Sequence, residues 1–109
     1  MKKIIPVAAI CFAILMMLCR VSIHEGLAAP NGETLFMKNC QTCHKNGGNI
    51  INSKKTLSLQ DRKANGMTTV EDLVKNMRNP GPGMTSFDEN TIPNAEARAI
   101  AEYILKTFK

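Results

Sequence analysis

The chain has 109 residues and a formal net charge of +5, and 20 of its 48 apolar residues fall within the first 28 positions. The remaining 81 residues hold only 28 apolar side chains, no tryptophan and a net charge of +3. This length excludes a multidomain enzyme. So few apolar side chains also leave little for a protein-only core, and domains of this size often need a disulfide, a metal or another staple.

Residues 1–28 have the parts of a secretory signal peptide. Two lysines precede an uncharged apolar run, residues 4–19, and small residues stand at Gly26 and Ala28. A basic start, an apolar middle and small residues at −3 and −1 are typical of an export signal. We predict cleavage after Ala28, which leaves residues 29–109 as one domain in the bacterial periplasm. An uncleaved membrane anchor is the alternative, although the run is shorter than the roughly 20 residues needed to span a bilayer.

The first helix of the mature chain is predicted over residues 32–43. Asn31 is placed to cap its start, and Glu33 in the first turn complements the positive helix end. Four residues share one face at helical spacing, namely Gly32, Phe36, Cys40 and Cys43. Residues 45–55 contain an Asn-Gly-Gly-Asn run and are expected to form a loop.

Two short helices are expected next. Ser58 is placed to cap a helix that begins at Leu59, with Gly66 as its left-handed stop. Thr69 is placed to cap the following helix, and Pro80 ends it because proline restricts the preceding residue to extended geometry. The predicted buried face of this second helix consists of Val70, Leu73, Val74 and Met77.

The last helix is predicted from Ala95 to about Phe108, capped by Asn94. Its apolar side consists of Ala97, Ile100, Ala101, Ile104 and Phe108. Because no alternating strand pattern and no repeat is present, we predict an all-α fold of about four short helices joined by long loops. Long loops in so small a domain indicate that something large lies among them.

The most specific chemical signal is Cys40-Gln41-Thr42-Cys43-His44. Cysteines three residues apart face the same way on a helical turn, so their thiols can bond to two vinyl groups along one edge of a haem. The next residue, His44, then directs its imidazole at the haem iron. The pattern is typical of covalent haem c attachment. The apolar disc of the haem would supply the missing core.

Three other interpretations of the two cysteines fit less well. A thioredoxin-like redox pair needs a preceding strand, whereas a helix is predicted there. A zinc site needs two more ligands, and His44 is the only histidine in residues 29–109. A disulfide across two intervening residues closes too small a loop to stabilise the domain much, and it gives His44 no role.

The second axial ligand is a methionine or is absent, since the mature chain has no other histidine. Met37 precedes the attachment turn on the same helix, so it cannot reach the opposite face of the haem. Met77 lies on the apolar stripe of its helix, where it is expected to fill the core. Met84 lies in a loop whose prolines stiffen it and whose glycines let the backbone pass close to a flat ring. We expect Met84 to bind the iron, with Met67 or an open site as the alternatives.

These motifs resemble those of the class I c-type cytochromes, closest to the small cytochrome c6 and c-553 group. In chain order they are Gly32-x-x-x-Phe36-x-x-Asn39-Cys40-x-x-Cys43-His44, Gly47-Gly48-Asn49, Lys55-Thr56-Leu57, Gly66-Met67, Met84-x-x-Phe87 and Ala101-x-Tyr103-Ile104. The resemblance implies the cytochrome c fold around one haem, axial His44 and Met84, and a closing helix whose aromatic packs near Gly32 and Phe36. Two positions depart from the family pattern: Thr85 replaces the usual proline, and Asn76 stands where photosynthetic members often carry glutamine near the haem.

The function expected from this resemblance is a one-electron carrier, not an enzyme, that serves redox proteins outside the cytoplasmic membrane as a monomer. The alternatives are a haem sensor or peroxidase-like domain with an open distal site, and a haem subunit of a larger oxidoreductase complex. One hypothesis is that basic side chains form a ring that steers an acidic partner. For each side chain taken singly, the stronger interpretation is that it is only a solvated surface charge. The ring would consist of Lys45, Lys54, Lys55, Arg62 and Lys63. Nucleic-acid binding is not expected, because dense basic patches and stacking aromatics are missing, and no membrane attachment is expected after signal cleavage.

Overall fold

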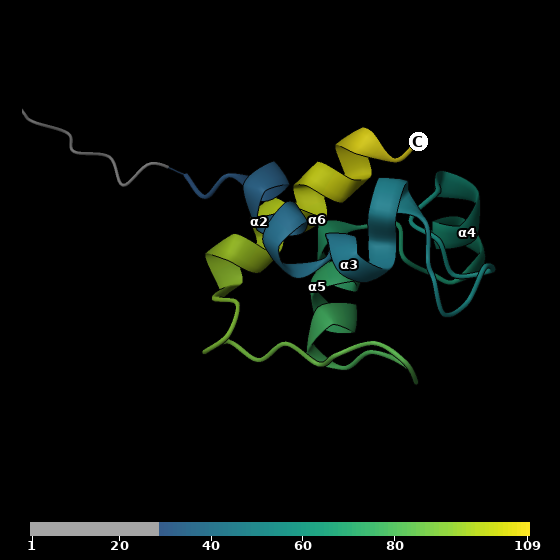
Figure 1. The fold of residues 1–109 in the computed structure, drawn as a ribbon. Coiled ribbons are helices and arrows are strands. Elements are labelled where there is room, and N and C mark those ends of the chain that lie inside the picture. Colours follow the sequence, from purple (N-terminus) through teal and green to yellow (C-terminus); the bar gives the residue numbers. More distant parts are fainter. Residues whose placement is uncertain (1–28) are drawn as a thin grey trace, which may run out of the picture.

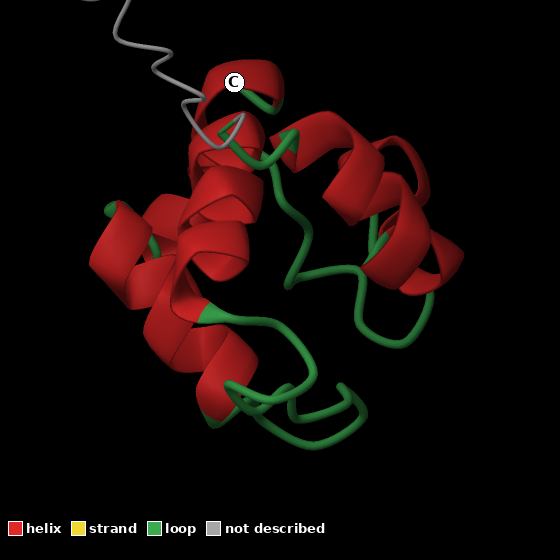
Figure 2. Cartoon of the chain, turned by 90° about the vertical axis from the view of Figure 1, so that its left-hand side faces the viewer, coloured by secondary structure: helices red, strands yellow, loops and turns green. Residues whose placement is uncertain are grey.

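The computed structural model describes residues 29–109, in which helices are joined by loops and no strand occurs (Figure 2). This all-α architecture agrees with the prediction from the sequence. The predicted signal peptide and its cleavage after Ala28 lie outside the described residues. Within residues 29–109, no helix is both long and apolar enough to cross a membrane.

The first helix is interrupted at the haem motif, so the prediction of one continuous helix over residues 32–43 was wrong. Helix α2 (Gly32–Asn39) begins at Asn31, whose Oδ1 accepts a hydrogen bond from the Thr34 N–H at 3.1 Å. It ends at Cys40, whose φ of −120° and ψ of −31° depart from helical values. A new turn, α3 (Gln41–His44), then forms around the Cys40 carbonyl, which accepts from the N–H groups of Cys43 and His44. The motif therefore occupies its own turn.

The segment predicted as loop after the motif begins with a short 3-10 turn, η1 (Lys45–Gly47). Helix α4 (Leu59–Ala64) starts where it was predicted, because the Ser58 hydroxyl accepts from the Asp61 N–H at 3.3 Å. Gly66 follows it with a φ of +71°, which confirms the left-handed stop.

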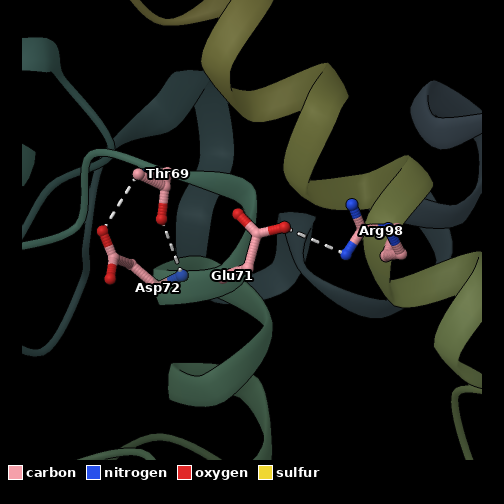
Figure 3. Close-up of polar contacts among 4 residues, drawn as sticks. All are labelled: Thr69, Glu71, Asp72 and Arg98. Carbon is pink, nitrogen blue, oxygen red and sulfur yellow. Dashed lines mark hydrogen bonds and ion pairs between the residues drawn. The ribbon is translucent and has the colours of Figure 1, made fainter.

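Helix α5 (Val70–Arg78) is held at its start by a reciprocal cap (Figure 3). The Thr69 hydroxyl accepts from the Asp72 N–H at 3.1 Å, and the Asp72 carboxylate accepts from the Thr69 N–H at 3.0 Å. The helix ends at Asn79, the residue before Pro80, as predicted. Its φ of −139° and ψ of 73° are non-helical but not fully extended.

Helix α6 (Asn94–Thr107) begins one residue before the predicted start. Pro93, with φ of −53° and ψ of 154°, occupies the cap position, so the prediction that Asn94 caps this helix was wrong. The Asn94 side chain has a tertiary partner instead: its Oδ1 accepts a hydrogen bond from Nη2 of Arg78 at 2.8 Å. The helix end at Thr107 lies one residue before the predicted Phe108.

The core lies where α6 packs against α2 and α5 (Figure 1). Its buried side chains are Phe36, Leu73, Met77, Ile92, Ala97, Ile100, Ala101 and Ile104. The Phe36 ring has its centroid 5.3 Å from that of Tyr103 and 5.5 Å from that of Phe108. Gly32 lies against α6, because a Cβ there would collide with the backbone of Ala99. The predicted packing of the closing helix on Gly32 and Phe36 is therefore confirmed.

The predicted buried faces are confirmed in part. Leu73 and Met77 are buried, whereas Val70 and Val74 are only half-buried at the edge of the core. On α6 the predicted alanine and isoleucine positions are buried, and Phe108 is half-buried against Phe36. A core of eight buried apolar side chains is small for a domain of this length, as the composition indicated.

Candidate haem site

An open cavity lies among α3, α4, α5 and the loop that contains Met84. The four residues predicted to hold the cofactor all line it, namely Cys40, Cys43, His44 and Met84. Met67, the alternative ligand, also lines the cavity, whereas Met37 is 47% exposed on α2 and does not. Met77 lines the cavity as well, but it is buried in the core, as its predicted role as filler requires. The fold thus brings the attachment motif and the Met84 loop to one cavity.

Cys40 and Cys43 form no disulfide, and both line the cavity wall. Cys40 is half-buried, and desolvation raises the pKa of its thiol to about 11, so the group is protonated at neutral pH. Cys43 is exposed. A helix, α2, precedes the pair where a thioredoxin-like site would have a strand. No group of three or more His, Cys, Asp or Glu side chains arranged to hold a metal ion occurs in the described part of the chain.

The imidazole of His44 is oriented by the turn that follows it. Its Nδ1 lies 2.8 Å from the carbonyl oxygen of Gly48. Because a carbonyl oxygen only accepts hydrogen bonds, Nδ1 carries the proton and donates it. Nε2 is then the unprotonated nitrogen, which is the form that binds a metal. The Gly48 carbonyl therefore selects the tautomer that a haem iron requires.

The Met84 loop is anchored at both of its sides. After Met84, the Phe87 N–H donates to the Met77 carbonyl at 2.9 Å, and the Ser86 hydroxyl donates to the Arg78 carbonyl at 2.7 Å. Before Met84, Gly83 has a φ of +91° and packs so closely that a Cβ would lie 2.9 Å from Cγ2 of Ile51. Such a position favours glycine both sterically and conformationally.

Asn76 contributes a polar contact to this site. Its Nδ2 donates to the Sδ atom of Met84 at 3.8 Å, from the half-buried side of α5. The sequence flagged Asn76 only as a departure from the family pattern. Its place three residues after the buried Leu73 on α5 was the available signal that it borders the cavity.

Arg62 is placed differently from the prediction. It was assigned to an exposed basic ring, but its side chain is buried and lines the cavity. Its Nε and Nη2 atoms donate to backbone carbonyls of Leu57 and Phe108 at 2.8 and 2.7 Å. The ring is therefore reduced to four exposed lysines, Lys45, Lys54, Lys55 and Lys63. Helix α4 is too short and too polar for its sequence pattern to show which side faces inward.

The cavity wall fits a haem in its chemistry. Two thiols, one imidazole and one thioether are the donors that c-type haem attachment and axial ligation use. The apolar part of the wall suits the flat ring, and it consists of Phe36, Ile51, Leu57, Leu73, Met77, Pro82, Phe87 and Ile104. The polar part is contributed largely by residues 49–65.

Comparison with known proteins places the chain in a family. Residues 27–104 match the family model described as cytochrome c oxidase, cbb3-type, subunit III. Cytochrome c6 of Cyanidioschyzon merolae is 37% identical over 79 residues, which are 72% of this chain and 74% of that protein.

Two solved structures show the same fold at appreciable identity. The outer membrane cytochrome OmcF of Geobacter sulfurreducens is 46% identical, with a TM-score of 0.70 over 72% of this chain and 99% of that one. Cytochrome c6C of Synechococcus sp. PCC 7002 is 28% identical, with a TM-score of 0.67 over 72% of this chain and 94% of that one. The chain belongs to the class I c-type cytochromes, is similar to cytochrome c6, and carries one covalently bound haem c.

Proposed function

We propose that this protein carries single electrons between redox partners outside the cytoplasmic membrane, with Cys40 and Cys43 tethering the haem and His44 and Met84 binding its iron. The observation that supports this most strongly is that one cavity receives both an imidazole of defined tautomer and an anchored thioether. The relatives named cytochrome c6 are electron carriers, not enzymes.

A haem held in this way supplies one-electron oxidation and reduction of its iron. The side chains of this chain would do the rest by binding and orienting. The two thioethers fix the haem against α3, and the Gly48 carbonyl keeps His44 in position. The soft thioether of Met84 favours the reduced state, and the apolar wall limits access of water. No general acid or base is needed, since no proton has to move in such a transfer.

The surface near the motif suits brief encounters with a partner. Cys43 is exposed, and Ile50 and Ile51 are 68% and 64% exposed on the loop that borders the cavity. Weak electron-transfer complexes use small interfaces, for which such a patch suffices. The four lysines that remain exposed are consistent with the hypothesis that positive charge steers an acidic partner to this side. Export by cleavage after Ala28, a periplasmic location and a monomeric state belong to the same proposal.

Axial ligation by Met84 distinguishes a carrier from a haem sensor or peroxidase-like domain with an open site. We expect the oxidised holoprotein to show the weak far-red sulfur-to-iron absorption band, and the ferrous form to resist carbon monoxide. Met84→Ala should abolish the band and allow carbon monoxide to bind, because an axial position is then open.

Met67→Ala is the matched control, since Met67 lines the same cavity. It should keep both the band and the resistance to carbon monoxide. A native protein that is high-spin and binds carbon monoxide readily would contradict the carrier proposal. Loss of the band in Met67→Ala alone would assign the ligand to Met67 instead.

A subunit of a larger complex is a second candidate, because the matching family model is described as a subunit of a cytochrome oxidase. The measurement that separates the two is the size of the native protein in an extract prepared without detergent and in one prepared with detergent. A free carrier elutes near the mass of the mature chain in both. Elution as a stable complex with fixed stoichiometry would favour the subunit.

A further inference from the structure

Arg78, the last residue of α5, is bound through its side chain to three oxygen atoms of the chain. Its Nη1 donates to the carbonyl oxygens of Phe87 and Asp88 at 3.0 Å each, and its Nη2 donates to Oδ1 of Asn94 at 2.8 Å. Phe87 and Asp88 follow the Met84 loop, and Asn94 is the first residue of α6. Arg78 therefore joins three segments, which are the end of α5, the exit of the Met84 loop and the start of α6.

Two of the three acceptors of Arg78 are consecutive main-chain carbonyls, so these bonds restrain the backbone and not a side chain. A guanidinium is a planar fork whose donors point in set directions, and it holds its acceptors in one arrangement. Among residues 29–109 the one ion pair joins Arg98 to Glu71, so the hydrogen bonds of Arg78 go to neutral oxygens. Bonds from a charged donor are stronger than those between neutral groups. The contact therefore restrains the path of the chain at residues 87 and 88.

The stretch that precedes these carbonyls has few other restraints. Within the described part of the chain, no main-chain hydrogen bond ties residues 80–85 to a helix. Met84 lies inside this stretch. The contacts that hold it there are the packing of Gly83 against Ile51 and the bond from the Asn76 amide to the Met84 sulfur. The position of that sulfur therefore depends on where the two ends of the loop are held.

We propose that Arg78 is a positioning residue for the axial ligand, which holds the exit of the Met84 loop so that the thioether stays on the haem iron. Arg78 does not line the cavity, so it acts through the backbone of residues 87 and 88 and not by contact with the haem. Groups that orient a metal ligand change metal affinity by about 10–100-fold when they are removed. This inference rests on the binding of the iron by Met84 that is proposed above, and it adds the part of the fold that keeps this ligand bound.

The competing explanation is that Arg78 only stabilises the fold as a whole by joining α5 to α6. Arg98 is a matched control for that role, because its ion pair with Glu71 also joins α6 to α5 and neither side chain lines the cavity. Gly32→Ala is a second control, since its added Cβ would collide with the backbone of Ala99 and disturb the crossing of α2 and α6. A general loss of stability appears in the second control as well, whereas a role in holding the axial ligand is specific to Arg78.

The test follows the displacement of the methionine from the ferric holoprotein by imidazole. Covalent haem is first verified from the pyridine haemochrome spectrum, and axial methionine from the far-red sulfur-to-iron band of the wild-type protein. At saturating imidazole the rate at which this band disappears is limited by dissociation of the thioether. That limiting rate therefore reports how firmly the ligand is held, and the unfolding midpoint in denaturant is measured beside it.

We expect Arg78→Gln to raise the limiting rate about tenfold or more, because the exit of the loop is released. Arg78→Lys should restore the wild-type rate only in part, since an ammonium keeps the charge but not the fork geometry. Arg98→Gln should keep a rate near that of the wild-type protein. Gly32→Ala should do the same, even though its unfolding midpoint is lower.

The proposal is overturned if Arg78→Gln and Arg98→Gln show the same limiting rate, or if Gly32→Ala raises the rate as much as Arg78→Gln does. If Arg78→Gln fails to mature, Arg78→Lys and Asn94→Ala decide the question in its place, because Asn94→Ala removes one acceptor of the fork. Both should raise the rate, and unchanged rates in both would also overturn the proposal.

Failure of the proposed axial role of Met84 gives a different result. A wild-type protein that carries covalent haem but lacks the far-red band would contradict axial methionine, and with it this inference. A wild-type protein that shows the band, and whose limiting rate does not depend on Arg78, would contradict this inference alone.

Discussion

The side-chain amide of Asn76 on α5 lies 3.8 Å from the Sδ atom of Met84, and it is the polar partner of that thioether. A hydrogen bond to sulfur withdraws electron density from it, so a Met84 that binds the iron as proposed would be a poorer donor to ferric iron. Asn76→Leu keeps the size of the side chain but removes the donor, so we expect a lower midpoint potential, measured by spectroelectrochemistry.

Asn76→Gln is the matched control, because it keeps an amide that can reach the sulfur. Its potential should lie closer to that of the wild-type protein. Equal potentials in Asn76→Leu and the wild-type protein, with the far-red band unchanged, would show that the amide has no influence on the thioether.

The contact between Gly32 and α6 predicts a large effect from one methyl group. A Cβ at Gly32 would lie 2.8 Å from the Ala99 carbonyl carbon, and the carbonyl oxygen is closer still. Because the obstruction is backbone, α2 and α6 must move apart. We expect Gly32→Ala to lower the free energy of unfolding by about 1–3 kcal/mol, measured by denaturant titration of the holoprotein.

Gly81→Ala provides the comparison for this substitution. A Cβ at Gly81 meets only the end of the Lys55 side chain, at 3.6 Å. Its unfolding midpoint should stay close to that of the wild-type protein. If the two alanine variants unfold at the same denaturant concentration, the close crossing of α2 and α6 is not important for stability.

Removal of either cysteine that we propose to tether the haem is expected to prevent stable folding. Among residues 29–109 the core holds eight buried apolar side chains, and a core this small rarely supplies more than about 3–5 kcal/mol by itself. Cys40→Ser and Cys43→Ser should therefore accumulate at a small fraction of the wild-type level, measured by immunoblot together with haem staining. Either variant recovered as a well-folded haem-free protein would show that the chain does not need the haem as its core.

The start of α5 should make stability dependent on pH. The Thr69 side chain and the backbone N–H groups of Thr69 and Thr68 hold the Asp72 carboxylate, and this lowers its pKa below the ordinary value. Because folding favours the ionised form, this stabilisation is present above the unfolded-state pKa. It is lost as the pH falls through the lower folded-state pKa.

We therefore expect Asp72→Asn to lower the unfolding midpoint at pH 7 and to approach the wild-type midpoint as the pH falls through the folded-state pKa of Asp72. Glu71→Gln is the control on the same turn, since its ion pair with Arg98 joins side chains that are 70% and 51% exposed (Figure 3). Such a pair contributes little to stability. A wild-type midpoint with the same acid dependence as that of Asp72→Asn would contradict the proposed role of the cap.

Local sequence signals determined most helix starts. Asn31, Ser58 and Thr69 cap helices where they were expected to, because a short polar side chain bonds N–H groups within its own turn. Asn94 has the same chemistry but does not cap α6. Pro93 already occupies the cap position, and Arg78 from α5 binds the Asn94 side chain. Where a tertiary partner competes, the local signal fails.

The sequence alone indicated the haem chemistry that the family confirms, because the Cys40–His44 motif places the proposed haem-binding donors within one turn and needs no distant partner to be recognised. It also indicated that residues 29–109 lack a sufficient core. Only the tertiary structure decided which polar side chains turn inward toward the cavity. Arg62 was predicted to be a surface charge because α4 is short and polar. Its side chain is instead held inside by hydrogen bonds to the carbonyls of Leu57 and Phe108, and Phe108 is 46 residues away along the chain. Contacts over such separations depend on how helices pack, which local periodicity does not encode.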